Sequence, residues 1–177
     1  MNVTGLFRKR HALRAPYLLL FELSAAMMAL RAVPLSEVVC DSVLALCLLF
    51  LSISDWERSR IPNTLLQIPA VCRVVFLICT AGWRPLFSSL SGAAFLALTM
   101  ALISHIGGHL WGVGCFGGGD IKLFGVAGLY LGAERGLWCA GIACMIGLIT
   151  ALAVHRNRFP FGPSISAAII LCLLLPG

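Results

Sequence analysis

The fold is decided by stretches such as residues 86–104, which read LFSSLSGAAFLALTMALIS and contain no charged side chain. A transmembrane helix needs about 20 mostly apolar residues, and this stretch comes close to that length. Outward from it, the whole chain of 177 residues is 60% hydrophobic and 11% charged, whereas about 25% of the residues of an ordinary soluble domain are charged. This composition excludes a soluble globular protein.

Apolar segments of this kind follow one another along the chain. We predict an all-α, polytopic membrane helix bundle with about seven transmembrane helices, at about residues 15–33, 38–54, 64–81, 86–104, 119–132, 136–154 and 160–176. Residues 1–177 then form a single integral-membrane domain, with residues 1–14 as a basic tail. The fifth segment is short for a full crossing, which indicates tilt or a start below the membrane surface. The first segment lacks a small-residue cleavage site, and we interpret it as an uncleaved signal anchor.

The basic residues support this count of helices. Seven spans put the N-terminal tail and every second loop on one side of the membrane, and that side carries Arg8, Lys9, Arg10, Arg14, Arg58, Arg60, Lys122, Arg156 and Arg158. The opposite side carries only Arg31, Arg84 and Arg135, and Arg73 lies inside a span. Because basic residues gather on the cytoplasmic side, we expect a cytoplasmic N-terminus. The net charge of +6 reflects this orientation. It does not indicate nucleic-acid binding, since no basic stripe or aromatic-basic module is present.

The cysteines and histidines give little support for a metal or redox site. Seven of the eight cysteines lie in apolar runs, where cysteine behaves as a small hydrophobic residue, and no C-x-x-C pair occurs. His105 and His109 are spaced i, i+4 and could share a helical face, but only Cys115 accompanies them. We expect interfacial histidines, no metal and no cofactor.

Two of the seven acidic residues stand at predicted helix ends on the same side of the membrane. Asp55 ends the second span and Asp120 opens the fifth, and both ends lie at the cytoplasmic boundary in the topology above. Ionisable groups at the edge of a span are costly and therefore candidates for function. Taken singly, Asp55 could instead be an interfacial cap or a partner of Arg58, and Asp120 could be the N-cap of its helix.

Two carboxylates at one depth suit the chemistry of an aspartic peptidase. Like charges a few Å apart do not both ionise easily, so such a pair shares one proton. One member then takes a proton from the attacking water, and the other donates one toward the carbonyl oxygen and the leaving amine. The titration belongs to the pair, and we assign neither role to one residue.

A glycine-rich stretch precedes the second aspartate. Seven glycines fall between Gly107 and Gly119, and a backbone without side chains can lie close to an extended peptide. A flexible loop is the alternative interpretation. The functional one is favoured because the stretch abuts an apolar helix, where non-helical backbone is tolerated only in protein or beside a wet cavity.

These residues carry a resemblance. The G-x-G-D motif at Gly117 to Asp120, the earlier Asp55 with the following residues 60–63 (RIPN), and the late P-F-G-P at residues 160–163 together resemble the type IV prepilin peptidase family of membrane aspartic proteases. The resemblance spans roughly residues 38–176. It implies that Asp55 and Asp120 are the catalytic pair, with Gly117, Gly119 and Lys122 in the substrate-binding or active-site loop.

The resemblance also implies a substrate and a location. The substrate would be a prepilin or pseudopilin, cut at the cytoplasmic face of a bacterial inner membrane between a short basic leader and an apolar helix. The partners would be the lipid bilayer and the assembly machinery of a type IV pilus or of type II secretion. Many bacterial members carry an N-terminal cytoplasmic loop with paired C-x-x-C motifs and an N-methyltransferase activity. The sequence has neither the loop nor the pairs, and we expect a peptidase without methyltransferase activity.

Other polar and small residues have structural interpretations. Glu22 and Arg73 lie at similar depths in their spans, and we expect them to pair. Lys122 follows Asp120 by two residues, which turns it to another helix face and disfavours an ion pair between them. Gly128, Gly132 and Gly136 repeat every four residues, which permits close helix packing. Glu37 and Asp41 are expected at a solvated helix end.

Two other functions compete with the peptidase. A small proton-coupled transporter would place acids near the bilayer midplane and show internal repeats, and we find no second copy of the glycine-rich segment. A non-catalytic scaffold for pilus assembly would keep the fold without needing either aspartate.

Overall fold

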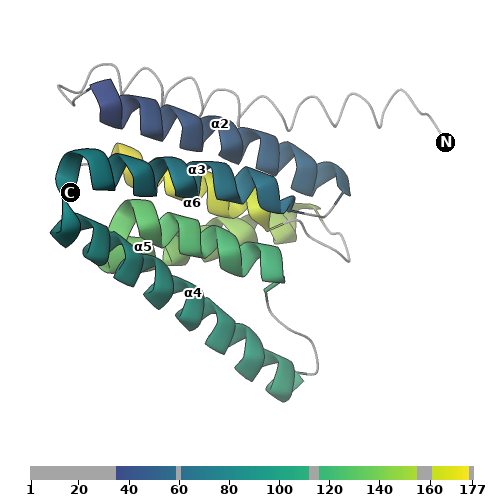
Figure 1. Cartoon of the computed structure of the whole chain (residues 1–177). Coiled ribbons are helices and arrows are strands. Elements are labelled where there is room, and N and C mark those ends of the chain that lie inside the picture. Colours follow the sequence, from purple (N-terminus) through teal and green to yellow (C-terminus); the bar gives the residue numbers. More distant parts are fainter. Residues whose placement is uncertain (1–34, 59–60, 112–115, 155–160, 176–177) are drawn as a thin grey trace, which may run out of the picture.

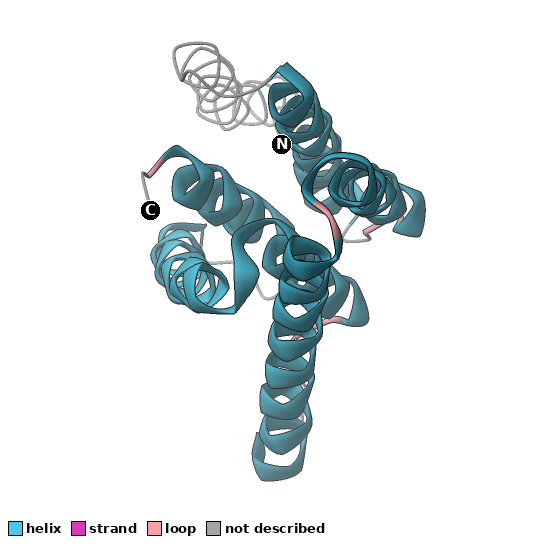
Figure 2. Cartoon of the chain, turned by 60° about the vertical axis from the view of Figure 1, so that its left-hand side comes forward, coloured by secondary structure: helices cyan, strands magenta, loops and turns pink. Residues whose placement is uncertain are grey.

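The computed structural model describes residues 35–58, 61–111, 116–154 and 161–175, and all of its elements are helices (Figure 2). They are α2 (Leu35–Arg58), α3 (Asn63–Phe76) with a π-helical turn at Leu77–Ala81, α4 (Trp83–Trp111), α5 (Gly118–Val154) and α6 (Gly162–Leu174). The prediction of an all-α polytopic membrane bundle is confirmed for the described residues. The first predicted span, at 15–33, lies outside them.

Four stretches within these helices are long and apolar enough to cross a membrane: Ser36–Trp56, Asn63–Ala81, Trp83–Leu110 and Gly118–Leu152. Helix α6, at Gly162–Leu174, is apolar but shorter. Large apolar side chains are also exposed on the outside of the bundle, among them Phe50, Leu98, Trp138 and Leu152. An outer surface of this kind is suited to lipid, because the hydrocarbon chains of lipids are as apolar as these side chains.

Helix α5 is two helices joined at a sharp break. Gly132 has φ 77° and ψ −179° inside it, a conformation that costs a glycine little. The ring of Phe161 lies close to the backbone of Gly147 and 5.5 Å from the ring of Phe116. A straight helix would put residues 118 and 147 about 44 Å apart, so the chain reverses at Gly132. The predicted segments 119–132 and 136–154 are these two halves.

The predicted glycine repeat packs helices α4 and α5 together. A Cβ atom added at Gly92 of α4 would lie 2.8 Å from the carbonyl oxygen of Gly128, and one added at Gly136 would lie 2.7 Å from Leu96. Gly128 and Gly136 therefore allow the close approach that the spacing predicts. Gly132 serves differently, since its positive φ makes the break and an added Cβ would have no neighbour within 4 Å.

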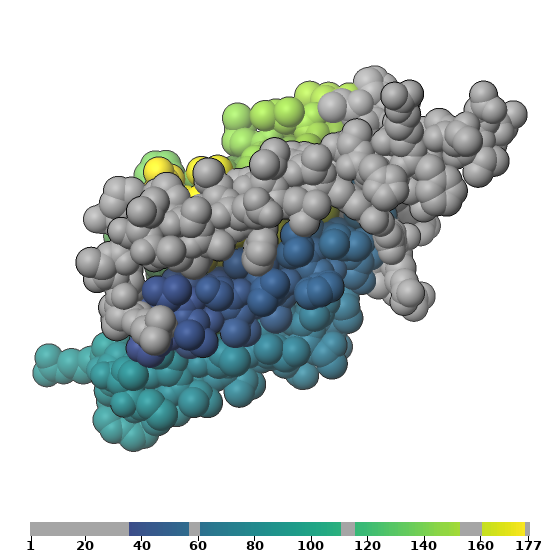
Figure 3. Space-filling view, turned by 90° about the horizontal axis from the view of Figure 1, so that it is seen from above, coloured from purple at the N-terminus to yellow at the C-terminus, as the bar shows by residue number. Residues whose placement is uncertain are grey.

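The core lies between α2, the first half of α5 and α6. Its fully buried side chains include Leu44, Leu48, Phe124, Ile165 and Ile169. Figure 1 shows α2, α3, α5 and α6 running side by side, while α4 lies at an angle and diverges toward its end at Trp111. In the view from above, the surface of α2 lies directly beside that of the helices that follow it (Figure 3). This arrangement brings the end of α2 and the starts of α5 and α6 to one end of the bundle.

Candidate active site

Asp55 lies in the last turn of α2 and is buried, with 6% of its surface exposed. Its Oδ2 accepts a hydrogen bond of 2.8 Å from the backbone N–H of Gly162, the first residue of α6. The first N–H groups of a helix have no partner within it, so the carboxylate satisfies one of them. The contact requires glycine, because a Cβ at position 162 would lie 2.7 Å from the same oxygen.

Asp120 is the third residue of α5 and is half-buried. Its Oδ2 accepts a hydrogen bond of 3.2 Å from the backbone N–H of Gly117. This is the arrangement in which an acidic residue of the first turn bonds back to the residue before the helix. Asp120 is therefore not the N-cap residue itself, but its carboxylate bonds to the N–H of Gly117, which precedes the helix, and this bond holds the carboxylate near the helix start.

Packing brings the two carboxylates to the same end of the bundle, because the ring of Phe161, next to Gly162, lies 5.5 Å from that of Phe116, next to Gly117. Each carboxylate takes one backbone N–H, from Gly162 and Gly117 respectively. Among the side chains that the structure describes, which do not include those of residues 57–60, neither aspartate forms an ion pair with a basic group. The described part of the site therefore consists of two acids at one end of the bundle, each held by a backbone amide.

The residues after Asp55 pack against those around Asp120. A Cβ at Gly119 would lie 2.9 Å from Cβ of Ile61. The absence of a side chain at position 119 therefore allows Ile61, from the segment after Asp55, to pack against the start of α5. Lys122 donates a hydrogen bond of 3.0 Å from Nζ to Oδ1 of Asn63. The lysine thus bonds to Asn63 and not to Asp120, as its position in the helix predicts.

Aromatic rings join the late P-F-G-P segment to the segment around Asp120. Phe161 lies immediately before Gly162, and its ring is 5.5 Å from that of Phe116. Phe116 in turn stands 6.0 Å from Phe124 at a steep angle. The three segments, far apart in the sequence, therefore meet at one place. The contact between Asp55 and Gly162 spans 107 residues, and hydropathy alone does not predict it.

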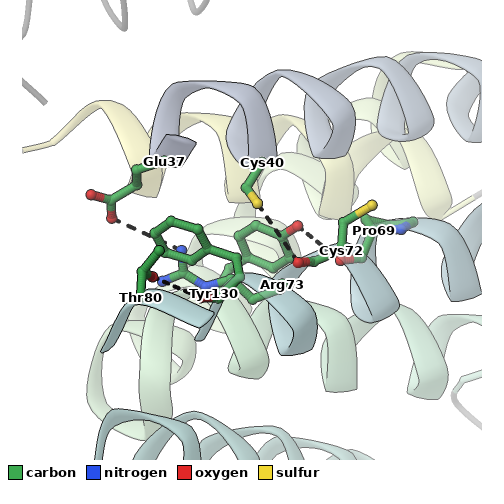
Figure 4. A network of polar contacts seen from close by, with 8 residues as sticks. Glu37, Cys40, Pro69, Cys72, Arg73, Thr80 and Tyr130 are labelled. Carbon is green, nitrogen blue, oxygen red and sulfur yellow. Dashed lines mark hydrogen bonds and ion pairs between the residues drawn. The ribbon is translucent and has the colours of Figure 1, made fainter. Parts of the chain in front are cut away.

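Arg73 pairs with Glu37, whereas its depth in the membrane span suggested Glu22 as its partner. Its guanidinium lies 3.9 Å from a carboxylate oxygen of Glu37 and stands over the rings of Phe76 and Tyr130, at 5.5 and 5.0 Å (Figure 4). Glu22 lies outside the described residues, and its predicted pairing with Arg73 stays a prediction. Glu37, expected at a solvated helix end, is partly exposed and also pairs across helices.

The histidine pair has no further metal ligand among the described residues. The rings of His105 and His109 pack edge to face at 4.7 Å. No group of three His, Cys, Asp or Glu side chains suited to a metal occurs within residues 35–58, 61–111, 116–154 and 161–175. Cys115 lies outside these ranges.

Comparison with known proteins adds independent evidence. The type IV leader peptidase family matches residues 42–152. The "Prepilin leader peptidase/N-methyltransferase" of Bacillus subtilis (strain 168) is 30% identical to the chain in an alignment over 137 residues that covers 72% of the chain. The chain spans about half of that relative, 52% of its length, and no solved structure matches. The residues matched by the family include Asp55, Asp120 and the segments 61–63 and 116–119, and the chain belongs to the type IV leader peptidase family.

Proposed function

We propose that this chain is a membrane-embedded aspartic endopeptidase that removes the short basic leader of type IV prepilins or pseudopilins at the cytoplasmic face of the membrane. Asp55 and Asp120 are its catalytic pair. The membrane is the inner membrane of a bacterium, and the N-terminus of the chain is cytoplasmic. The reaction is peptide-bond hydrolysis, without methylation of the new N-terminus.

One observation carries the proposal: two acids from different helices lie at one end of the bundle, and each accepts a hydrogen bond from a backbone amide. Such a pair shares a proton. The ionised carboxylate takes a proton from a water molecule as that water attacks the scissile carbonyl. The protonated carboxylate bonds to the carbonyl oxygen and then supplies a proton to the departing amine.

The position of the pair suits a substrate that is part apolar helix and part polar leader. Asp55 lies at the end of the candidate span in α2, and Asp120 lies at the start of the candidate span in α5. A substrate helix lying beside these spans in lipid would bring its junction with the leader to the level of the two carboxylates. Lys122 is bonded to Asn63 and has the same sign as a basic leader. We therefore assign it to the packing of the site and not to leader binding.

The test is cleavage of a prepilin encoded alongside this chain, in membranes that carry the wild-type protein or one variant at equal amounts. Asp55→Asn and Asp120→Asn keep the size of each side chain and remove its acid. We expect each to lower the cleavage rate by about 10³-fold, within the range that acid and base groups contribute. Glu37→Gln, at the other end of α2, is the matched control and should cleave at close to the wild-type rate.

Two outcomes would contradict the proposal. Full cleavage by either aspartate variant would exclude the shared-proton mechanism. Assembly of pili that depends on the chain but is equally restored by both aspartate variants would favour the non-catalytic scaffold.

A further inference from the structure

Ser104 makes a contact that the two aspartates and their motifs do not account for. It lies in α4, and its hydroxyl is partly buried. Oγ donates a hydrogen bond of 3.0 Å to the carbonyl oxygen of Phe116 and accepts one of 3.2 Å from the N–H of the same residue. One hydroxyl thus satisfies both backbone groups of a residue that is twelve positions later in the chain and outside any helix.

Two other hydroxyls on α4 behave differently. Ser91 donates to the carbonyl oxygen of Ser88 and Thr99 to that of Phe95, each within the helix and exposed. Such bonds are local and common for serine and threonine in helices. Ser104 instead links two separate segments of the chain.

Phe116 is in a position to pass this constraint to both carboxylates. It directly precedes Gly117, whose N–H bonds to Asp120. Its ring lies against Phe161, which directly precedes the Gly162 whose N–H bonds to Asp55. A shift of Phe116 would therefore move both donors that hold the pair.

We propose that Ser104 is a positioning residue of the site: its hydroxyl holds Phe116 in place and, through the backbone of Gly117 and the ring of Phe161, sets the separation of Asp55 and Asp120. Ser104 touches neither carboxylate and takes part in no proton transfer. This inference rests on the proposed peptidase function, because separation matters only if the two acids act together.

The test compares Ser104→Ala with Ser91→Ala, which removes a hydroxyl from the same helix but only a local bond. Cleavage of a prepilin is measured per folded enzyme in detergent micelles, with Asp120→Asn in the same series. We expect Ser104→Ala to lower kcat by about tenfold, the size of effect expected from two neutral hydrogen bonds, and to leave KM within about twofold. Loss of alignment appears in kcat because it weakens the transition state and not substrate docking. Ser91→Ala should match the wild type in both constants.

Amide hydrogen exchange provides a readout that does not need the reaction. The Phe116 N–H loses its acceptor in Ser104→Ala, so we expect exchange in the peptide that covers residues 116–120 to become at least about tenfold faster. Unchanged exchange overturns the inference, and so does a wild-type kcat in Ser104→Ala. A wild-type kcat in Ser104→Ala together with an inactive Asp120→Asn overturns only the role of Ser104. Full activity of Asp120→Asn overturns the proposed function and this inference with it.

Discussion

The two ends of the helix bundle differ in the charges that they bring together. At one end, Asp55 and Asp120 lie together and bond to backbone amides. Toward the other end, Glu37 faces Arg73, whose guanidinium also stands over the ring of Tyr130 (Figure 4). Opposite charges neutralise each other and hold helices together, whereas two like charges leave a proton to be shared. The Glu37–Arg73 end is therefore arranged for packing, and the other end has the pair of acids that the proposed mechanism requires.

The same contrast appears in the hydrogen bonds around each cluster. In the Arg73 cluster, side chains bond to carbonyl oxygens of α3: Tyr130 donates to Pro69 and Cys40 to Cys72. These bonds fasten α2 and α5 to α3. At the carboxylate pair the direction is reversed, and backbone N–H groups donate to side chains. Donors aimed at a carboxylate stabilise its charged form, which a peptidase needs for one member of its pair.

Of the substitutions that distinguish the two ends, Gly162→Ala should have the largest effect, a loss in the rate of prepilin cleavage. The new Cβ would lie 2.7 Å from Oδ2 and 3.1 Å from Cγ of Asp55, so the carboxylate must move. Since a displacement of about 1 Å in a catalytic group costs about 10²-fold in rate, we expect a loss of that size in prepilin cleavage. The matched control is Gly141→Ala in α5, where an added Cβ has no neighbour within 4 Å.

Although alanine suits a helix better than glycine, the close contact of the new Cβ with Asp55 overpacks a buried site and should cost about 1–3 kcal/mol in the free energy of unfolding. Cleavage is therefore compared per folded molecule, so that lost activity is separated from lost structure. A cleavage rate equal to that of Gly141→Ala would show that the contact between α6 and Asp55 has no part in catalysis.

Arg73→Gln should have the next largest effect, on stability and not on cleavage. The substitution leaves Glu37 without its partner and removes the cation from two aromatic rings, and we expect a loss of about 2 kcal/mol in the free energy of unfolding. Cleavage per folded molecule should stay within about twofold of wild type. Unfolding by denaturant in detergent micelles measures the first quantity and a prepilin assay the second.

A double-mutant cycle identifies the partner of Arg73. Since Glu37 is partly exposed, its own replacement by Gln should cost less, about 1 kcal/mol, and the cost of the double variant should be smaller than the sum. The same cycle with Glu22→Gln tests the pairing expected from the sequence. Strict additivity with Glu37 would mean that the ion pair contributes nothing to stability.

The sequence predicts the membrane fold and the end at which the site lies, for reasons that are physical. Apolar runs locate helices because lipid admits little else, and the charge bias of the loops shows which helix ends share a side. Asp55 and Asp120 follow from these two rules together. The break at Gly132 was predicted as a gap between two segments, although not as a single positive-φ residue.

Contacts between helices are less predictable from the same rules. The pairing of Arg73 with Glu37, the bond from Gly162 to Asp55 and the bonds of Ser104 to Phe116 all depend on how each helix is rotated about its axis and which neighbours it meets. Depth along the membrane normal, which hydropathy provides, carries no information on rotation. The signal for Ser104 is its place at the end of an apolar segment just before the glycine-rich stretch, and this place alone does not predict the bonds to Phe116.

The smallest effect on the cleavage rate is expected from Lys122→Met. Lys122 lies near the carboxylate pair but bonds to Asn63. Its Nζ is exposed, so water replaces much of what is lost, and we expect cleavage to fall by no more than about threefold. If the lysine acts by joining its helix to the segment after Asp55, Asn63→Ala should have a similar effect, and the double variant should be no worse than either single one. A loss above about 100-fold that Asn63→Ala does not share would instead mean that Lys122 contacts the substrate. Lys122 would then be a substrate-binding residue beside the two carboxylates.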